Sequence, residues 1–361
     1  MKEAFIDKTL VVAIRDTDVP VPAAGQVLIR VVVSGTNPKD WKMPLEWPGE
    51  RAPTNEGDDI AGYVEAVGHG VLGFRKGDKV AAFHQVMKPH GSWAEYAIAP
   101  DYTTFHIPAH TSFEANLKLI GDDFAEAATI PLAAMTAAVG LYQRLKLPLP
   151  WNPTSEPMPL VIYGGATAVG AFAIKFARLS NIHPIITVAG RGAAFVETLI
   201  DPTKGDMIID YREGDEAVRT KIKVAAGGRP IRYAFDAVAE QGSDQNVSAA
   251  VTAPGEIVTV LPRDDHQPPE GIHIYHVIVG FVHAPPAAGK TIEDGEFAAA
   301  FFSLMGRGLA QGWFSGHPFE VHPGGLAGIE SAMQDLRAGK ASAVKYVVRI
   351  GETEGVKQQD P

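Results

Sequence analysis

The stretch Leu160–Leu179, LVIYGGATAVGAFAIKFARL, decides the fold of this chain. Its first four residues, Leu160–Tyr163, have the apolar pattern of a buried strand and run directly into a glycine turn, Gly164–Gly170. An apolar helix pattern follows the turn. Such a turn lets backbone N–H groups approach a pyrophosphate, and the N-terminus of the helix adds a favourable dipole. The alternative is a strand–turn–helix corner with a purely structural role.

The residues after the next two predicted strands indicate which dinucleotide this turn binds. An NAD enzyme would place an acidic residue after the second strand, to bind the ribose 2′-OH, but here Ala189-Gly190-Arg191 follows. An arginine suits a 2′-phosphate, and Tyr211, just after the third strand, could reach the same group. The alternatives are a solvated loop arginine and a partly exposed aromatic ring. The sequence therefore favours NADPH, with contacts from Arg191, Tyr211 and the whole turn: Gly164, Gly165, Ala166, Thr167, Ala168, Val169 and Gly170.

Strand and helix patterns alternate around this turn, which predicts βαβ units and a parallel sheet. The predicted strands of this region are Leu160–Tyr163, Ile185–Val188, Met207–Asp210, Tyr233–Asp236, Ile257–Leu261 and Ile274–Val279. Helical patterns at Gly170–Leu179 and Ala193–Leu199 separate some of them.

The first hundred residues have a different pattern, with short strands and frequent glycine turns that predict an antiparallel, barrel-like domain. The strands expected there are Val27–Val33, Ile60–Val67, Lys79–Phe83 and Trp93–Ile98. An Ala-rich helix is expected at Phe124–Leu145. After about Ala288 we expect helices at Gly295–Ala310 and Gly325–Ala338 and strands at Phe319–His322 and Lys345–Ile350, and we expect this tail to complete the first domain.

Composition excludes several classes of function. The chain has no cysteine, so disulfides, thiolate zinc sites, iron–sulfur clusters and a cysteine nucleophile are ruled out. A formal charge of -10 argues against nucleic-acid or anionic-membrane partners. The N-terminal residues are charged and lack the apolar region of a signal peptide, and the longest apolar stretch, Ala127–Tyr142, is shorter than a membrane span. We therefore expect a cytoplasmic protein.

Six ordered motifs resemble the medium-chain dehydrogenase/reductase superfamily along nearly the whole chain. They are Asn37–Lys42, Gly57–Val64, Phe74–Val80, Gly91–Tyr96, Ile130–Ala138 and the glycine turn. The resemblance implies an α/β protein with a GroES-like, mainly antiparallel β-barrel catalytic domain and a Rossmann doubly wound parallel sheet. It implies a discontinuous catalytic domain, 1–128 and 290–361, an NADPH-binding domain, 129–289, and an active site in the cleft between them.

The resemblance is closest to the zinc-free branch of that superfamily. Asn37, Asp58 and Leu132 stand where zinc-dependent members have ligands, and a lone carboxylate cannot make a tetrahedral zinc site. The four-cysteine structural lobe is also missing. We therefore expect no metal. Asn-Pro-x-Asp-Trp-Lys, the proline loop before Leu160, and Thr167 in place of the usual glycine resemble the fungal trans-acting enoyl reductases, which implies a carrier-bound or small-molecule acyl substrate and a polyketide synthase partner.

Reduction of an enone or enoyl thioester needs a hydride at the β-carbon, stabilisation of the carbonyl oxygen and a proton at the α-carbon. Lys42 is our first candidate for the electrostatic or proton-donating role. Thr136 could hydrogen-bond the nicotinamide carboxamide or the substrate carbonyl, and Asn37 could hold a cofactor hydroxyl. The alternatives are a surface lysine, a helix threonine bonded to its own backbone and a turn-forming asparagine. Asp40 is expected to support the backbone.

Two alternatives to an enoyl reductase stay open at this point. Quinone reduction by the same zinc-free branch is the second hypothesis, and a non-catalytic NADPH-binding protein is the third. The oligomeric state is open between monomer and homodimer, because the strand Ile274–Val279 could pair across a two-fold axis while Pro285 and Pro286 could block that edge.

Overall fold

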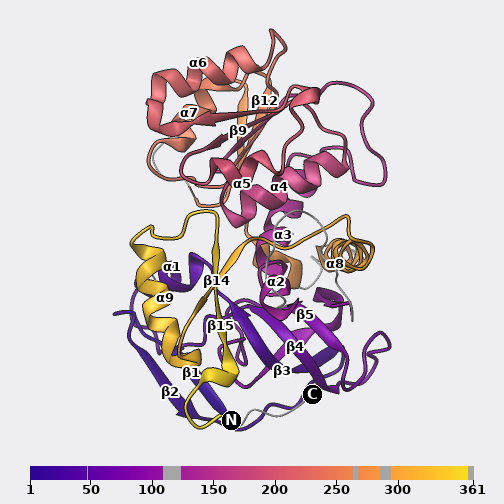
Figure 1. Ribbon diagram of the computed structural model, residues 1–361, viewed down its shortest axis with the longest axis vertical. Coiled ribbons are helices and arrows are strands. Elements are labelled where there is room, and N and C mark those ends of the chain that lie inside the picture. The colour runs from indigo at the N-terminus through magenta and orange to yellow at the C-terminus, as the bar shows by residue number, and fades with distance from the viewer. Residues whose placement is uncertain (47, 109–122, 263–266, 285–293, 357–361) are drawn as a thin grey trace. The chain divides into compact units, whose positions relative to one another are not determined.

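The computed structural model describes the whole chain except residues 47, 109–122, 263–266, 285–293 and 357–361 (Figure 1). The chain divides into two compact units. The first unit consists of Met1–Leu132 and Gly280–Pro361, and the second of Ala133–Val279. Each has a sheet and a hydrophobic core of its own.

The second unit is built on a six-stranded parallel sheet in the order β10-β9-β8-β11-β12-β13. Numbered along the chain, this is the order 3-2-1-4-5-6 of the Rossmann fold. It confirms the predicted parallel sheet. The strands are β8 (Leu160–Tyr163), β9 (Ile185–Ala189), β10 (Met207–Asp210), β11 (Tyr233–Asp236), β12 (Gly255–Thr259) and β13 (Ile272–His276).

Helices cover both faces of this sheet. One face packs against Val218 and Ile222 of α6 and Val247 of α7. On the other face, Phe235 of β11 packs against Gly140 in the segment Val139–Arg144. A Cβ added to Gly140 would lie 2.3 Å from the Phe235 ring. The helices of the unit include α4 (Ala168–Leu179), α5 (Ala193–Glu197), α6 (Asp215–Ala225) and α7 (Ser243–Ala250). The sheet is therefore doubly wound, as predicted.

The sheet of the first unit joins the two ends of the chain. Its order is β14-β15-β3-β4-β5-β7, with β6 paired to β3, and every pairing except β14 with β15 is antiparallel. The strands are β3 (Gln26–Gly35), β4 (Asp59–Val67), β5 (Lys79–Phe83), β6 (Tyr96–Pro100), β7 (Thr104–His106), β14 (Phe319–His322) and β15 (Lys345–Arg349). A separate hairpin pairs β1 (Lys2–Ile6) with β2 (Val12–Asp16).

The helices of the first unit are α1 (Lys39–Glu46), α2 (Asp123–Ala127), α8 (Asp294–Gln311) and α9 (Gly328–Arg337). Ile329, Ala332 and Met333 of α9 pack into a core that includes Ile29 of β3 and Val348 of β15.

Several predicted elements differ from the structure in their bounds. The strand expected at Trp93–Ile98 begins only at Tyr96, because Trp93 and Glu95 use their backbone groups in hydrogen bonds with β1. The strand expected at Ile274–Val279 lies at Ile272–His276, and Val279 begins a short 3₁₀ helix instead.

The helix expected at Phe124–Leu145 is divided. After α2, a new helix, α3 (Pro131–Ala138), begins at a proline, whose missing N–H is tolerated at a first helical position, and a π-helix follows at Val139–Arg144. Taken together as Asp123–Arg144, these helices form a stretch of 22 residues that is long and apolar enough to cross a membrane. The sequence analysis had placed the apolar stretch at Ala127–Tyr142 and expected it to be too short. However, 89% of the most apolar window of Asp123–Arg144 is buried inside the protein, as in the core helix of a soluble protein.

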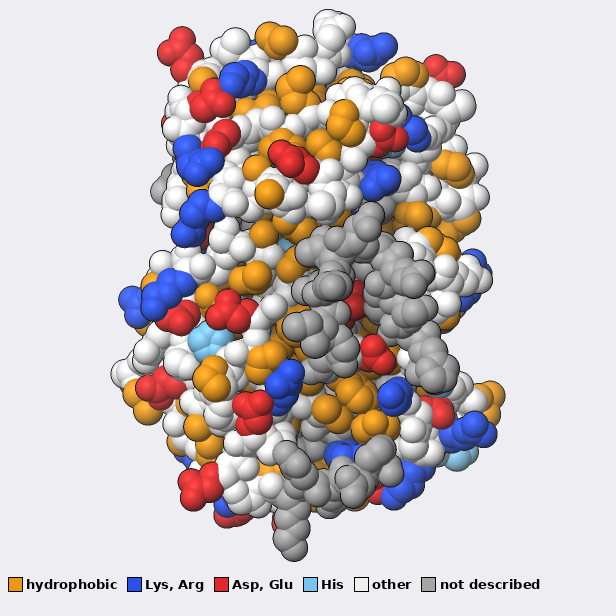
Figure 2. Space-filling model, viewed as in Figure 1, with side chains coloured by type: hydrophobic (Ala, Val, Ile, Leu, Met, Phe, Trp, Pro, Cys, Tyr) orange, Lys and Arg blue, Asp and Glu red, His pale blue; other side chains and the backbone are white. Residues whose placement is uncertain are grey.

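The surface drawn in Figure 2 carries acidic and basic side chains interspersed with one another. On this face no large field of one sign is visible, which agrees with the moderate overall charge of the chain.

Candidate functional site

The glycine turn lies between β8 and α4, at the carboxyl edge of the parallel sheet. Since β8 lies between β9 and β11, the strand order reverses beside it, which is the position where Rossmann folds bind ligands. Ala168 and Val169 open α4, so their N–H groups have no preceding carbonyl within the helix. The hydroxyl oxygen of Thr167 accepts the N–H of Gly170 at 3.0 Å. The turn thus presents backbone donors and a helix dipole together.

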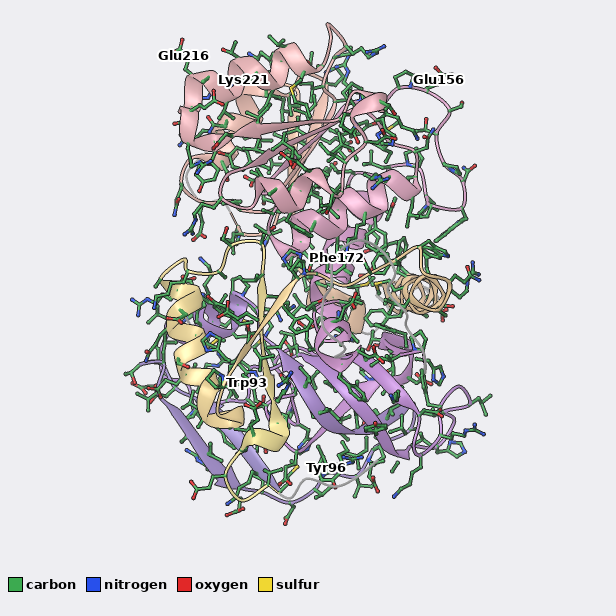
Figure 3. The ribbon with its side chains drawn as sticks, viewed as in Figure 1. Trp93, Tyr96, Glu156, Phe172, Glu216 and Lys221 are labelled. Atoms are coloured by element: carbon green, nitrogen blue, oxygen red, sulfur yellow. The ribbon has the colours of Figure 1, made fainter. Side chains whose placement is uncertain are left out.

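Close packing explains why glycines occupy this turn. Gly164 has a φ of +86°, which side chains disfavour, and a Cβ on Gly170 would lie 2.2 Å from the carbonyl oxygen of Gly164. The first strand and the helix therefore approach each other directly. Phe172, labelled in Figure 3, is fully buried one turn into α4 and holds the helix against its unit.

The ends of β9 and β10 bring Arg191 and Tyr211 into the same region of the second unit. The two strands pair in parallel up to Ala189 and Asp210, so the residues that follow them are neighbours. The Tyr211 ring lies against Gly190, where a Cβ would be 2.4 Å from the ring. Arg191 is exposed, and Tyr211 is 47% exposed. A flat ring and a guanidinium at this edge form a suitable surface for an anionic ribose substituent.

Asp210 adds a carboxylate to that edge, which the sequence analysis did not single out. Arg212 donates to both of its oxygens from Nε, at 2.9 and 3.0 Å, and from Nη2 at 2.5 Å. These hydrogen bonds lower the pKa of Asp210 to about 2. Arg212 therefore neutralises an acidic residue that would otherwise repel a phosphate beside Tyr211. In the sequence, an arginine two residues after an aspartate at the end of a predicted strand was the signal that could have indicated this ion pair.

Asn37 and Lys42 lie in one segment of the first unit. Asn37 is 4% exposed, and its amide donates to Asp59 at 2.8 Å and accepts from Lys345 at 2.9 Å. Lys42 lies on α1, half-buried, with its ammonium 4.8 Å from the ring centroid of Trp41. The backbone N–H of Asn37 donates to Asp40 at 2.8 Å, so Asp40 supports the backbone.

Thr136 belongs to α3 and lies in the second unit, where it is 6% exposed. The helix begins next to a buried carboxylate, because the N–H of Leu132 donates to Asp59 at 2.7 Å. Leu132, which the sequence analysis placed at a zinc-ligand position, has no metal-binding atom in its side chain.

A buried cluster of charges surrounds Asp58. The ammonium of Lys39 lies 2.5 Å from one carboxylate oxygen of Asp58, and Nδ1 of His84 lies 2.8 Å from the other. Burial alone would raise the pKa of Asp58, but Lys39 and His84 hold it below its ordinary value. Burial raises the pKa of Asp40 to about 7, although Lys39 opposes the shift. The sequence analysis missed both Lys39 and His84.

This cluster does not fit a zinc ion. An ammonium already lies against Asp58, and His84 and Asp58 bind each other. Among the residues that the structure describes, no group of three or more His, Cys, Asp or Glu side chains is placed to hold a metal.

Comparisons with known proteins assign the family. Residues 23–109 match the alcohol dehydrogenase GroES-like domain. The chain is 43% identical over 333 residues to trans-enoyl reductase fsr4 of Gibberella fujikuroi, covering 91% of this chain and 92% of the relative. The chain belongs to the trans-enoyl reductases. Membership confirms the resemblance read from the six motifs and the prediction of an enoyl reductase. A second trans-enoyl reductase, resD of Aspergillus sclerotiorum, is 29% identical, with 93% of this chain and 96% of the relative covered.

Solved structures share the fold of this trans-enoyl reductase. The CurK enoyl reductase superposes with a TM-score of 0.74 at 19% identity, covering 96% of this chain and 98% of that chain. A mycobacterial protein solved in complex with NADPH gives a TM-score of 0.72 at 19% identity, with 97% and 99% covered. Both confirm the predicted medium-chain dehydrogenase/reductase architecture.

Proposed function

We propose that this trans-enoyl reductase uses NADPH to reduce the double bond of an α,β-unsaturated thioester that a polyketide synthase presents on its carrier protein. The observation that carries the proposal is the glycine turn at the strand-order reversal of the second unit, in a chain that belongs to this family. The mycobacterial structure with NADPH supports the choice of cofactor.

The residues of the second unit fit the phosphates of NADPH. The N–H groups of Ala168 and Val169, at the positive end of the α4 dipole, would hold the pyrophosphate. Arg191 would pair with the 2′-phosphate and Tyr211 would contact it, while Arg212 keeps Asp210 neutralised. When bound, NADPH supplies the hydride for the β-carbon.

The residues of the first unit and of α3 would act on the thioester. The ammonium of Lys42 would stabilise the negative charge that develops on the carbonyl oxygen, and it is also a candidate proton donor. The hydroxyl of Thr136 would orient the carboxamide or the carbonyl by a hydrogen bond. Asn37, fully engaged with Asp59 and Lys345, would hold the Lys42 segment in place.

The cellular compartment and the oligomeric state of the enzyme belong to the same proposal. We propose a cytoplasmic enzyme that meets its synthase without a nucleic acid or a membrane, and the formal charge of -10 supports the last two points. Monomer and homodimer both fit, because β13 is an edge strand of its sheet. Sedimentation of the purified protein separates the two.

The test is an anaerobic screen of NADPH consumption with crotonyl, 2-octenoyl and 2-methylcrotonyl coenzyme A thioesters, an enone and a quinone, together with metal analysis of the same preparation. We expect fastest turnover on a thioester and no stoichiometric metal. Faster reduction of the quinone would replace the proposal with a quinone reductase, and NADPH binding without any turnover would indicate a non-catalytic protein.

A further inference from the structure

Asp59 and Lys345 form a buried ion pair in the first unit. Nζ of Lys345 lies 2.6 Å from Oδ2 of Asp59, and their side chains are 4% and 0% exposed. They are 286 residues apart in sequence, at the starts of β15 and β4. Gly35 leaves room for the pair, because a Cβ there would lie 3.0 Å from Cβ of Asp59 and 3.2 Å from Cε of Lys345.

The pair is the centre of a hydrogen-bond network that reaches two helices. The amide of Asn37 donates to Oδ2 of Asp59 and accepts from Lys345, so it bridges both charges. Oδ1 of Asp59 accepts the backbone N–H of Leu132 at 2.7 Å. Asn37 lies two residues before α1, which contains Lys42, and Leu132 lies in the first turn of α3, which contains Thr136.

Every hydrogen bond of this network except the one from Lys345 to Asn37 depends on the acceptor oxygens of Asp59. Three donors converge on the carboxylate: the Asn37 amide, the Lys345 ammonium and the Leu132 N–H. Because the group is buried, water does not replace a lost partner. A change at Asp59 therefore releases Asn37 and the first turn of α3 together, while a change at a more distant buried charge releases neither.

We propose that Asp59 is a positioning residue of the reaction, which acts through Asn37 on the Lys42 segment and through Leu132 on the start of α3. The inference rests on the proposed function, since it assigns to Asp59 the alignment of the residues that would act on the thioester. Lys345 supplies the counter-charge to the Asp59 carboxylate in the interior.

The test separates alignment from stability. Asp59→Asn removes the charge and leaves the Lys345 ammonium unpaired, so this variant is expected to be both slow and unstable. The double variant Asp59→Val with Lys345→Met removes both charges with apolar side chains closer in volume to the originals, so no buried ammonium is left without its counter-charge. It leaves Asn37 and Leu132 without their acceptor.

We expect the double variant to melt above Asp59→Asn but below the wild type, because the buried Asn37 amide and Leu132 N–H lose their acceptor. Its kcat on the fastest thioester of the screen should be reduced by about 10–100-fold, with the Kd for NADPH within about threefold. Asp206→Asn is the control. Asp206 is a buried carboxylate of the second unit. It lies 2.7 Å from Nδ1 of His183 and accepts the backbone N–H of Ile185 at 2.8 Å. It should lose stability and keep kcat. Wild-type kcat in the double variant would overturn the inference.

A second measurement does not depend on turnover. Amide hydrogen exchange of peptides that cover 37–46 and 131–138 should be faster in the double variant than in the wild type, and unchanged in Asp206→Asn. Unchanged exchange in both peptides would overturn the inference even if the enzyme reduced no thioester. Failure of the wild-type protein to reduce any thioester would overturn the proposed function alone.

Discussion

The ammonium of Lys39 lies 2.5 Å from a carboxylate oxygen of Asp58, whose side chain is only 2% exposed. Removing one partner of a buried ion pair leaves the other charge uncompensated, which costs about 3–5 kcal/mol. Lys39→Met should therefore lower the free energy of unfolding by about that amount, measured by urea denaturation. Lys76→Met removes an exposed lysine that pairs with Glu65, and it should change stability little. Equal stability of the two variants would contradict the prediction.

The raised pKa of Asp40 predicts a pH-dependent stability. Burial raises this pKa to about 7 from its ordinary 3.8, so the folded protein keeps a proton that the unfolded chain releases between pH 4 and 7. The free energy of unfolding should therefore fall as pH rises through this window. Asp58 has the opposite shift, and its contribution is lost only as pH falls below 4.

Asp40→Asn tests this pH dependence directly. Urea denaturation of the wild type at several pH values should give a decline between pH 4 and 7, and the variant should give a flatter profile. Profiles that decline in parallel would show that Asp40 does not titrate there.

The glycine turn makes a prediction for cofactor binding. A Cβ on Gly170 would lie 2.2 Å from the carbonyl oxygen of Gly164, so Gly170→Ala must displace the start of α4. We expect the Kd for NADPH, measured by fluorescence titration, to rise at least about tenfold, or about 1.4 kcal/mol. Gly73→Ala is the matched control, since no atom lies within 4 Å of a Cβ there. A similar Kd in both variants would argue against a cofactor at this turn.

Arg191 is expected to decide between NADPH and NADH. Arg191→Ala should raise the Kd for NADPH by about 10–100-fold, because a charge-assisted hydrogen bond to the 2′-phosphate is lost. The Kd for NADH should be nearly unchanged. Arg229→Ala, an exposed arginine of the same unit, is the control. Parallel weakening of both dinucleotides by Arg191→Ala would indicate a general structural effect instead.

Lys42 is expected to contribute to the chemical step. Lys42→Met should lower kcat on a thioester by about 10²–10⁴-fold, the range for a positioned proton donor, with little change in melting temperature. Lys42→Arg retains the charge and should recover part of the rate. If the Lys42→Met variant had the kcat of the wild type, Lys42 would be a surface lysine with no role in the chemical step.

Local pattern alone predicted most of the second unit. The strands at 160–163, 207–210 and 233–236 begin and end where the sequence placed them, because buried parallel strands are short apolar runs bounded by turn residues. The turn at Gly164–Gly170 was equally readable, since strand, glycines and helix follow one another directly.

Only the tertiary structure decided which polar groups meet. Asp59 binds Lys345 across 286 residues, Asp58 binds His84 across 26, and Trp93 pairs with β1 instead of extending β6. A local pattern reports the period of one segment, whereas these partners are chosen by how distant segments fold against each other. Burial then gives each pairing its strength, because a charge or backbone group removed from water must find its partner within the protein.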